Sequence, residues 1–275
     1  MRRRLDAELV RRGLAPSREQ ARAAIDAGRV VVAGAPADKA ARMVDAAEPV
    51  EVLGPPPRFE SRGGDKLEAA LDRFGVDVAG RRVLDAGAST GGFTDCLLQR
   101  GAASVTAVDV GRAQLHERLR ADPRVTSLER TDIRSFRTTE PFPVVVADLS
   151  FISLRTVAGA LLGDNAASGA DVVVLVKPQF EAGRVEASKG KGVIRDPEVW
   201  ARVLRDVASA LAGHGAAMIG AMVSPLVGAD GNVEFLFHLR AHAPSPVGGI
   251  DLAPVVEAAQ ASATKSAAGG GGGGR

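Results

Sequence analysis

The sequence contains no tyrosine, and aromatic residues make up only 4% of its 275 positions. Proteins that hold single-stranded nucleic acid without sequence preference usually stack successive bases on aromatic side chains. The shortage therefore argues against a broad base-stacking platform. Recognition of shape and phosphates, with at most a flipped nucleotide, fits this composition better for any RNA partner.

Cysteine and long apolar runs are also scarce. Cys96 is the only cysteine, which excludes an intrachain disulfide and fits a reducing, cytoplasmic location. No apolar run reaches the roughly 20 residues that a membrane span needs. The start Met-Arg-Arg-Arg-Leu-Asp also lacks the apolar segment of a secretory signal. No stable membrane association is therefore expected. A metal is not expected either, because the spacing of metal ligands is absent from the four histidines His116, His214, His238 and His242.

The net charge of +2 is unevenly distributed along the chain. Residues 1–35 contain eight arginines and four acids, so this segment carries +4 and the remainder −2. A basic module joined to a near-neutral body indicates a polyanionic partner, although the chain's general preference for Arg over Lys explains the excess about equally well. The candidate RNA contacts in this segment are Arg3, Arg4, Arg11, Arg12, Arg18, Arg22 and Arg29.

Residues 1–53 are predicted to form a separate small α+β module. Apolar spacing predicts two helices, ending at Gly13 and Gly28, followed by strands over 29–32 and 50–53. With the motifs Arg-Leu-Asp, Ser-Arg and Gly-Arg-Val-Val-Val, this order resembles the alpha-L (S-four-type) RNA-binding module of ribosomal proteins and pseudouridine synthases. The resemblance implies that a basic helical face contacts phosphates of folded RNA. Residues 54–62, which include three consecutive prolines, are predicted to be a stiff linker.

Residues 63–242 alternate predicted strands with predicted helices, which indicates an α/β domain with a mostly parallel, Rossmann-like sheet covered on both faces. The last two strands are too close in sequence to enclose a helix, so they are predicted to pair antiparallel, an arrangement typical of class I methyltransferases. Residues 243–275 are rich in Pro, Ala and Gly and are expected to be a disordered tail. The seven strands are predicted at 82–85, 104–109, 124–128, 144–148, 171–176, 217–223 and 233–239, and the helices at 65–74, 91–100, 113–121, 154–163 and 197–212.

The segment 85–95, Asp-Ala-Gly-Ala-Ser-Thr-Gly-Gly-Phe-Thr-Asp, is the most informative motif of this domain. A glycine-rich turn between a strand and a helix presents backbone N–H groups to a ligand. The acid that precedes the glycines would repel a pyrophosphate but could pair with a cation, which favours S-adenosylmethionine over a dinucleotide. The alternative is a plain strand–turn–helix junction. The candidate cofactor-binding residues of this loop are Asp85, Gly87, Ser89, Gly91, Gly92 and Phe93.

Two further acids follow the next strands of the predicted sheet. Asp109 closes the second strand, where an acid in a nucleoside-binding sheet accepts hydrogen bonds from ribose hydroxyls. Asp132 follows the third strand, where its carboxylate could meet the adenine amino group. The alternative for each is a solvated acid at the end of a strand.

Four charged residues complete the predicted site. Asp148 and Lys177 end two apolar strands, at the sheet edge where open α/β sheets bind ligands. Glu234 lies in an apolar strand, where a carboxylate needs a partner, and Lys66 opens the first helix of the domain. In order and context these residues resemble the Lys-Asp-Lys-Glu tetrad of FtsJ-like ribose 2′-O-methyltransferases. With the entry Ser-Arg-Gly-Gly-Asp-Lys and the N-terminal module, the chain resembles the TlyA family of rRNA methyltransferases, also called haemolysins.

The resemblance implies methyl transfer from S-adenosylmethionine to cytidines of small- and large-subunit rRNA. A ribose hydroxyl is a poor nucleophile, so a base near its oxygen helps. Lys177 is the candidate base or hydroxyl-orienting group, with Asp148, which also belongs to the candidate cofactor site, and Glu234 as its orienters. Lys66 is expected to hold the substrate or tune the charge. Burial and neighbouring cations favour neutral Lys177 whereas the carboxylates oppose it, so the sequence leaves open which lysine is the base.

A basic segment at 184–195 is read as a loop beside this site, with Lys189 and Lys191 as candidate RNA contacts and a plain solvated loop as the close alternative. Ribosomal RNA and ribosomal subunits are therefore the expected partners. Two other function classes stay open: a ribosome-assembly factor with an idle site, and a membrane-lytic haemolysin. The second is disfavoured because no strongly amphipathic basic segment is present.

Overall fold

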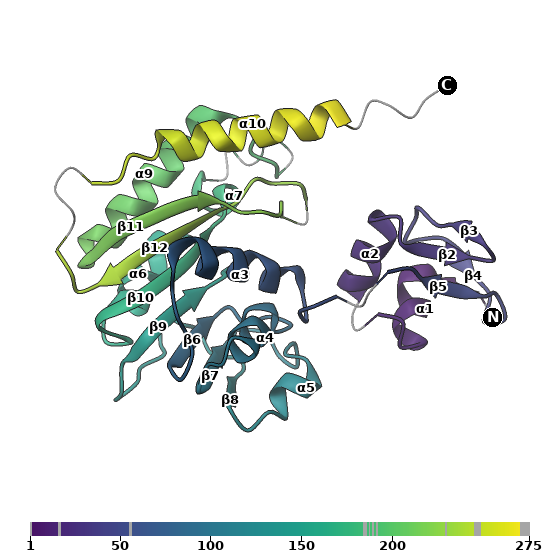
Figure 1. Ribbon diagram of the computed structural model, residues 1–275, viewed down its shortest axis with the longest axis horizontal. Helices are drawn as coiled ribbons and strands as arrows, with labels where there is room; N and C mark the ends of the chain where they lie inside the picture. Colours follow the sequence, from purple (N-terminus) through teal and green to yellow (C-terminus); the bar gives the residue numbers. More distant parts are fainter. Residues whose placement is uncertain are drawn as a thin grey trace. The chain divides into compact units, whose positions relative to one another are not determined.

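The computed structural model describes residues 2–15, 18–54, 57–183, 186, 188, 190, 192–228, 230–244 and 249–269. The chain divides into two compact units, Met1–Ser61 (unit 1) and Arg62–Arg275 (unit 2), drawn in purple to dark blue and in blue to yellow in Figure 1. The division falls near the end of the expected linker, where helix α3 already begins at Arg62.

Unit 1 is a small α+β module. Its two helices cover short antiparallel sheets with the strand orders β3-β2-β5 and β1-β4. Leu5 and Leu9 of α1, Ile25 of α2 and Val30 and Val32 of β2 are buried together in its core. The elements are β1 (Arg3–Arg4), α1 (Leu5–Arg11), α2 (Arg18–Asp26), β2 (Val30–Val32), β3 (Ala35–Pro36), β4 (Met43–Val44) and β5 (Val50–Val52).

Unit 2 is built on a seven-stranded sheet with the order β11-β12-β10-β9-β6-β7-β8. Strand β12 pairs antiparallel with both β10 and β11. All other pairings in the sheet are parallel: β10 with β9, β9 with β6, β6 with β7, and β7 with β8. The predicted α/β, methyltransferase-like sheet with an antiparallel last pair is therefore confirmed. The strands are β6 (Arg82–Ala86), β7 (Ser104–Val108), β8 (Val125–Leu128), β9 (Phe142–Ala147), β10 (Ala166–Val176), β11 (Ala216–Val223) and β12 (Phe235–Ala241).

Helices cover both faces of this sheet (Figure 1). Successive side chains of a strand point to opposite faces, so the apolar strands present apolar side chains on both sides that helices must bury. One face presents residues such as Leu84, Val145 and Val172 to a core shared with α6, α9 and α10. On the other face, Phe74 of α3 stacks on His238 of β12. The helices are α3 (Arg62–Phe74), α4 (Gly92–Gln99), α5 (Glu117–Arg120), α6 (Leu154–Leu162), α7 (Pro178–Glu181), α9 (Pro197–Gly213) and α10 (Ala253–Gly269).

Helix α10 corrects the expectation of a disordered tail from residue 243. Its Val256 and Ala259 are buried and belong to the main core of unit 2. Alanine is the strongest helix former, so an alanine-rich segment that offers even a narrow apolar stripe can fold against an existing surface. Composition alone therefore misjudged this segment. Residues 270–275 lie outside the described part of the chain.

A search of the described residues finds no helix with the length and apolar character that crossing a bilayer requires.

Candidate active site

Two glycines shape the loop between β6 and α4. Gly91 caps α4 with a φ of 105°, and a Cβ there would lie 2.2 Å from a methyl carbon of Leu119. Gly87 has a φ of 84°, and its Cβ would lie 2.5 Å from the carbonyl oxygen of Asp148. Both positions combine a left-handed backbone with a close neighbour, so a side chain at either would push α5 or the end of β9 away.

A cavity of about 470 Å³ opens at the carboxyl ends of β6, β7, β8 and β9. Its volume lies in the range of small-molecule sites, and its place matches the ligand edge of an open α/β sheet. The loop after β6 contributes Gly87 and Ser89, and the segment after β9 contributes Asp148 and the four residues that follow it. Of the predicted cofactor residues, those on the cavity wall are Gly87, Ser89, Asp109, Asp132 and Asp148.

Asp109 is fixed on the wall by two backbone donors. Ser89 N–H donates to its Oδ2 at 2.8 Å and Gly111 N–H to its Oδ1 at 2.7 Å. Each oxygen keeps a further lone pair, so the carboxylate can still accept from a ligand hydroxyl. Asp132 is paired at 2.5 Å with Arg134, whose hydrogen bonds hold the pKa of that carboxyl below its usual value. Arg134 lines the same cavity, and sequence reasoning missed it.

Asp85 differs from its expected place on the ligand surface. Its carboxyl is fully buried beneath the loop, where Thr94 Oγ1 donates to Oδ2 at 2.6 Å. Oδ1 has no hydrogen-bond partner within the described part of the chain. Burial raises the pKa of Asp85 to about 7; the Thr94 bond opposes this, and the charges of Asp148 and Asp109 add to it. Gly91, Gly92 and Phe93 are also buried, behind the loop.

The predicted tetrad is present as two ion pairs. Lys177 Nζ lies 2.5 Å from Asp148 Oδ1 and donates to Ser150 Oγ at 2.9 Å. Lys66 Nζ, from the first turns of α3, donates to Glu234 Oε2 at 2.6 Å in a buried pair.

The sheet register brings the two pairs to the same end of the sheet. The last residue of β10, Val176, pairs with the first of β12, Phe235, so Lys177 and Glu234 adjoin one another just beyond the pairing. Glu234 therefore precedes β12 and does not lie within it as predicted, although its side chain is buried. It is accommodated beside Gly228, where a Cβ would lie 2.6 Å from Glu234 Oε1.

Phe151 is an exposed aromatic residue on the cavity wall, and sequence reasoning missed it. It is 90% exposed, and its backbone is in the left-handed region with a φ of 65°. Its ring centroid is 5.1 Å from that of Phe180, and Lys177 Nζ is 5.9 Å from the Phe180 centroid. A bulky residue held at positive φ with its ring in solvent is a feature of functional sites. The sequence hint was an aromatic residue in the segment that directly follows a strand end of the predicted site.

In unit 1, two buried carboxylates each hold three arginines. Arg4, Arg18 and Arg22 contact Asp6, at N–O distances of 3.1, 3.1 and 3.2 Å. Burial raises the pKa of Asp6, but the hydrogen bonds from these arginines outweigh it and leave the pKa well below its usual value. The three guanidinium groups stay about half exposed.

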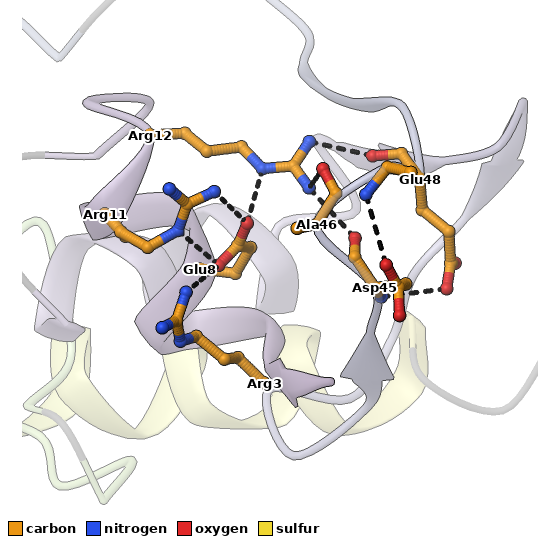
Figure 2. A network of polar contacts seen from close by, with 8 residues as sticks. Arg3, Glu8, Arg11, Arg12, Asp45, Ala46 and Glu48 are labelled. Atoms are coloured by element: carbon orange, nitrogen blue, oxygen red, sulfur yellow. Dashed lines mark hydrogen bonds and ion pairs between the residues drawn. The ribbon is translucent and has the colours of Figure 1, made fainter. Parts of the chain in front are cut away.

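Glu8 organises the second group, shown in Figure 2. Arg11 contacts it at 2.6 Å, Arg12 at 2.8 Å and Arg3 at 3.9 Å. The hydrogen bonds from Arg11 and Arg12 lower the pKa of Glu8 to about 2. Arg12 differs from the others: its side chain is only 18% exposed, and it also donates to the carbonyl oxygens of Asp45, Ala46 and Glu48 (Figure 2).

Arg12 therefore fastens α1 to the loop between β4 and β5. The guanidinium groups of the other five arginines remain available to a ligand. Of the remaining predicted RNA contacts, Arg29 is half-buried at the start of β2. Lys189 and Lys191 lie outside the described residues.

Comparison with known proteins agrees with this division. Residues 3–50 match the S4 domain, and residues 59–241 match the FtsJ-like methyltransferase family. A relative from Mycobacterium tuberculosis, 16S/23S rRNA (cytidine-2′-O)-methyltransferase TlyA, is 52% identical over 86% of this chain and 89% of its own length. The chain belongs to the TlyA family of FtsJ-like methyltransferases.

Other members of the TlyA family bear different names. YqxC of Bacillus subtilis is 47% identical over 86% of this chain and 85% of its own, and Hemolysin A of Brachyspira hyodysenteriae is 40% identical over 86% and 98%. A Streptococcus thermophilus protein described as a hemolysin has a solved structure with a TM-score of 0.78 and 38% identity, covering 96% of this chain and 98% of its own. The predicted family is confirmed.

A search of the described residues finds no group of three or more His, Cys, Asp or Glu side chains placed to hold a metal ion.

Proposed function

We propose that this chain transfers a methyl group from S-adenosylmethionine to the 2′-hydroxyl of a cytidine in ribosomal RNA. The observation that carries the proposal is the Lys177–Asp148 pair at 2.5 Å, beside a cavity of nucleoside size and at the same sheet end as the Lys66–Glu234 pair. The rRNA and cytidine specificity is taken from the printed activity of the TlyA relative, and the RNA-binding role of unit 1 from its match to the S4 domain.

The residues of the cavity fit S-adenosylmethionine. Asp109 keeps accepting capacity for ribose hydroxyls. Both oxygens of Asp132 already accept from Arg134, so an exocyclic amine would have to compete with Arg134 for this carboxylate. Asp85 Oδ1 is a buried acceptor with no partner in the described structure, so a donor delivered through the loop, directly or by water, would satisfy it. When bound, the cofactor supplies an electrophilic methyl carbon on a cationic sulfur. The carboxylates of Asp85, Asp109 and Asp148 make this end of the sheet favourable for that charge.

We assign to Lys177 the contact with the 2′-hydroxyl. Its nitrogen donates to Ser150 Oγ and contacts Asp148 Oδ1 as an ion pair, which leaves a further position on the nitrogen for the substrate oxygen. Methylation of a hydroxyl releases a proton, and neutral Lys177 would accept it as the new C–O bond forms. Asp148 orients the nitrogen and stabilises the lysinium that results.

The Lys66–Glu234 pair is a second, buried charge couple at the same end of the sheet. We propose that Glu234 fixes the ammonium group of Lys66 so that it can hold the substrate phosphate or hydroxyl. Most of the rate gain would come from alignment of the oxygen, the methyl carbon and the leaving sulfur, which is an effect of proximity.

Unit 1 would supply RNA affinity through the exposed arginines around Asp6 and Glu8, which bind phosphates and carry no base code. Phe151 would offer a flat apolar surface to the target base once that base leaves its stack. We propose that the protein acts on ribosomal subunits in the cytoplasm.

The test is transfer of tritiated methyl from S-adenosylmethionine to ribosomal subunits of cells that lack the gene, followed by digestion of the rRNA to nucleosides. We expect the label in 2′-O-methylcytidine. Label on a base would contradict the ribose assignment. RNA binding with no transfer would favour an assembly factor with an idle site. Lysis of erythrocytes by the purified protein without S-adenosylmethionine would support the haemolysin reading suggested by some relatives' names.

A further inference from the structure

The proposed active site is built on two segments that leave neighbouring strands. Strands β9 and β10 pair in parallel register as far as Ala147 and Val174. Beyond this point, residues 148–153 carry Asp148, Ser150 and Phe151, and residues 177–181 carry Lys177. The regular ladder no longer holds these segments, so their spacing depends on side chains.

Glu181, the last residue of α7, fastens the far ends of the two segments together. It is only 5% exposed. Its Oε1 accepts from Leu154 N–H at 2.6 Å, and its Oε2 accepts from Ser153 Oγ at 2.5 Å. Arg155 flanks the contact with a guanidinium nitrogen 3.5 Å from Oε2, and it also donates to the Glu181 carbonyl oxygen at 2.9 Å. A carboxylate at the N-terminus of α6 is favoured by the helix dipole and by free N–H groups.

The contacts form a closed ring. One arm runs from Asp148 to Leu154, the other from Lys177 to Glu181, and the Lys177–Asp148 pair closes one end while the Glu181–Leu154 bond closes the other. The rings of Phe151 and Phe180 meet between them. A change at the Glu181 end therefore reaches Lys177 through four residues of a short helix on one side and a six-residue loop on the other.

We propose that Glu181 is a positioning residue for methyl transfer: it clamps the segments after β9 and β10 so that Lys177 and Asp148 keep their productive spacing. The inference rests on the proposed function of the Lys177 site. Glu181 is not on the cavity wall and acts through the two segments. Misplacement of a reacting group by about 1 Å can lower a rate by about 100-fold, so a clamp of this kind acts on kcat.

Asp171, a buried carboxylate of β10, provides a matched control for Glu181. It is 6% exposed and bound to Arg81 at 2.9 Å, Arg240 at 2.8 Å and His238 at 2.9 Å. Asp171 lies six residues before Lys177, about 20 Å along an extended strand. Asp171→Asn should therefore lower stability without moving the site. The comparison separates a loss of position from a general loss of stability.

The experiment measures kcat, KM for S-adenosylmethionine, RNA affinity and melting temperature for the full chain and for Glu181→Ala, Glu181→Gln, Ser153→Ala and Asp171→Asn. We expect Glu181→Ala to lower kcat by about 100-fold. Its KM for S-adenosylmethionine and its RNA affinity should each stay within about 3-fold of the values for the parent protein. Glu181→Gln keeps an acceptor for Leu154 N–H and a hydrogen bond to Ser153, so it should restore kcat to within about 10-fold. Asp171→Asn should keep kcat within about 3-fold.

Equal kcat losses in Glu181→Ala and Asp171→Asn at equal melting temperature would overturn the clamp, as would a loss confined to KM. If Glu181→Ala does not fold, Ser153→Ala decides, because it removes one bond of the clamp and leaves the buried carboxylate with Leu154 and Arg155. A kcat unchanged in Ser153→Ala would then count against the proposal. Failure of the parent protein to methylate rRNA would instead refute the proposed function.

Discussion

The two units use buried carboxylates in opposite ways. In unit 1, Asp6 and Glu8 are each surrounded by three arginines, so positive charge exceeds negative and most of the guanidinium groups stay exposed. At the sheet end of unit 2, Lys177 and Lys66 each face one carboxylate, and no cation among the described residues pairs with the buried Asp85. The contrast fits the proposal that unit 1 binds an anionic partner, whereas the site in unit 2 would take a cationic methyl donor and accept one proton.

Removing the lysine that we assign to proton transfer should have the strongest effect on catalysis. Lys177→Ala should lower the methyl-transfer rate by about 100- to 10,000-fold, the usual range of a general base, with RNA binding unchanged. Lys177→Arg keeps the charge and can still pair with Asp148, but arginine does not give up its proton, so its loss should be as large. A Lys177→Arg rate within tenfold of the parent would show that Lys177 orients the hydroxyl and is not the base.

A substitution at Asp6 tests whether the RNA affinity of unit 1 depends on its net charge or on the positions of its arginine side chains. Asp6→Asn makes the module more positive, yet it releases Arg4, Arg18 and Arg22 from their common partner. We expect RNA affinity to fall by roughly 3- to 10-fold, and unit 1 to lose roughly 1–3 kcal/mol of stability, because buried charged hydrogen bonds are lost. Asp26→Asn, at an exposed aspartate of the same module, adds the same charge and should leave affinity equal or slightly higher. Stronger binding by Asp6→Asn would show that charge alone decides.

The two units should also respond to pH in opposite directions. The pKa values of Asp6 and Glu8 are lowered, so their contribution to unit 1 is fully present above about pH 5 and is lost as the pH falls toward 2. The pKa of Asp85 is raised to about 7, so unit 2 loses stability as the pH rises from about 4 to 7.

Hydrogen exchange read by mass spectrometry can follow each unit in the same chain. Without cofactor, Asp85→Asn should stabilise unit 2 by about 3–5 kcal/mol at pH 8 and by almost nothing at pH 4, because the pKa of Asp85 is raised from 3.8 to about 7. An equal gain at both pH values would mean that the Asp85 carboxyl does not titrate in this range.

Two arginines of unit 1 should differ, by a small margin, in what they contribute to RNA binding and to stability. Arg22→Ala removes a half-exposed guanidinium, so RNA binding should weaken a few-fold and its salt dependence should drop by about one unit of slope. Arg12→Ala removes a largely buried group with four internal acceptors, so it should lower the melting temperature of unit 1 and leave the salt slope unchanged. The reverse pattern would place Arg12 among the RNA contacts.

The sequence was sufficient to bring Asp148 and Lys177 together, because both follow parallel strands whose carboxyl ends meet at one edge. The sequence was misleading for Asp85. The order of strands does not show whether a carboxylate beside a glycine loop faces the ligand cavity or the protein core. Glu181 gave no signal, because its partners are a backbone N–H and a hydroxyl more than 25 positions away. Helix α10 was missed because alanine-rich composition describes both a tail and a helix.

The place of β12 between β10 and β11 also fixes when the active site can exist. Lys66 and its partner Glu234 are 168 positions apart, and Glu234 reaches Lys66 only when the last strand of the sheet inserts between two strands made before it. Such long-range pairing is a slow, late step of folding. Until β12 has been made and has inserted, the chain therefore lacks the Lys66–Glu234 pair, and the Val-rich edge of β10 stays open to other strands.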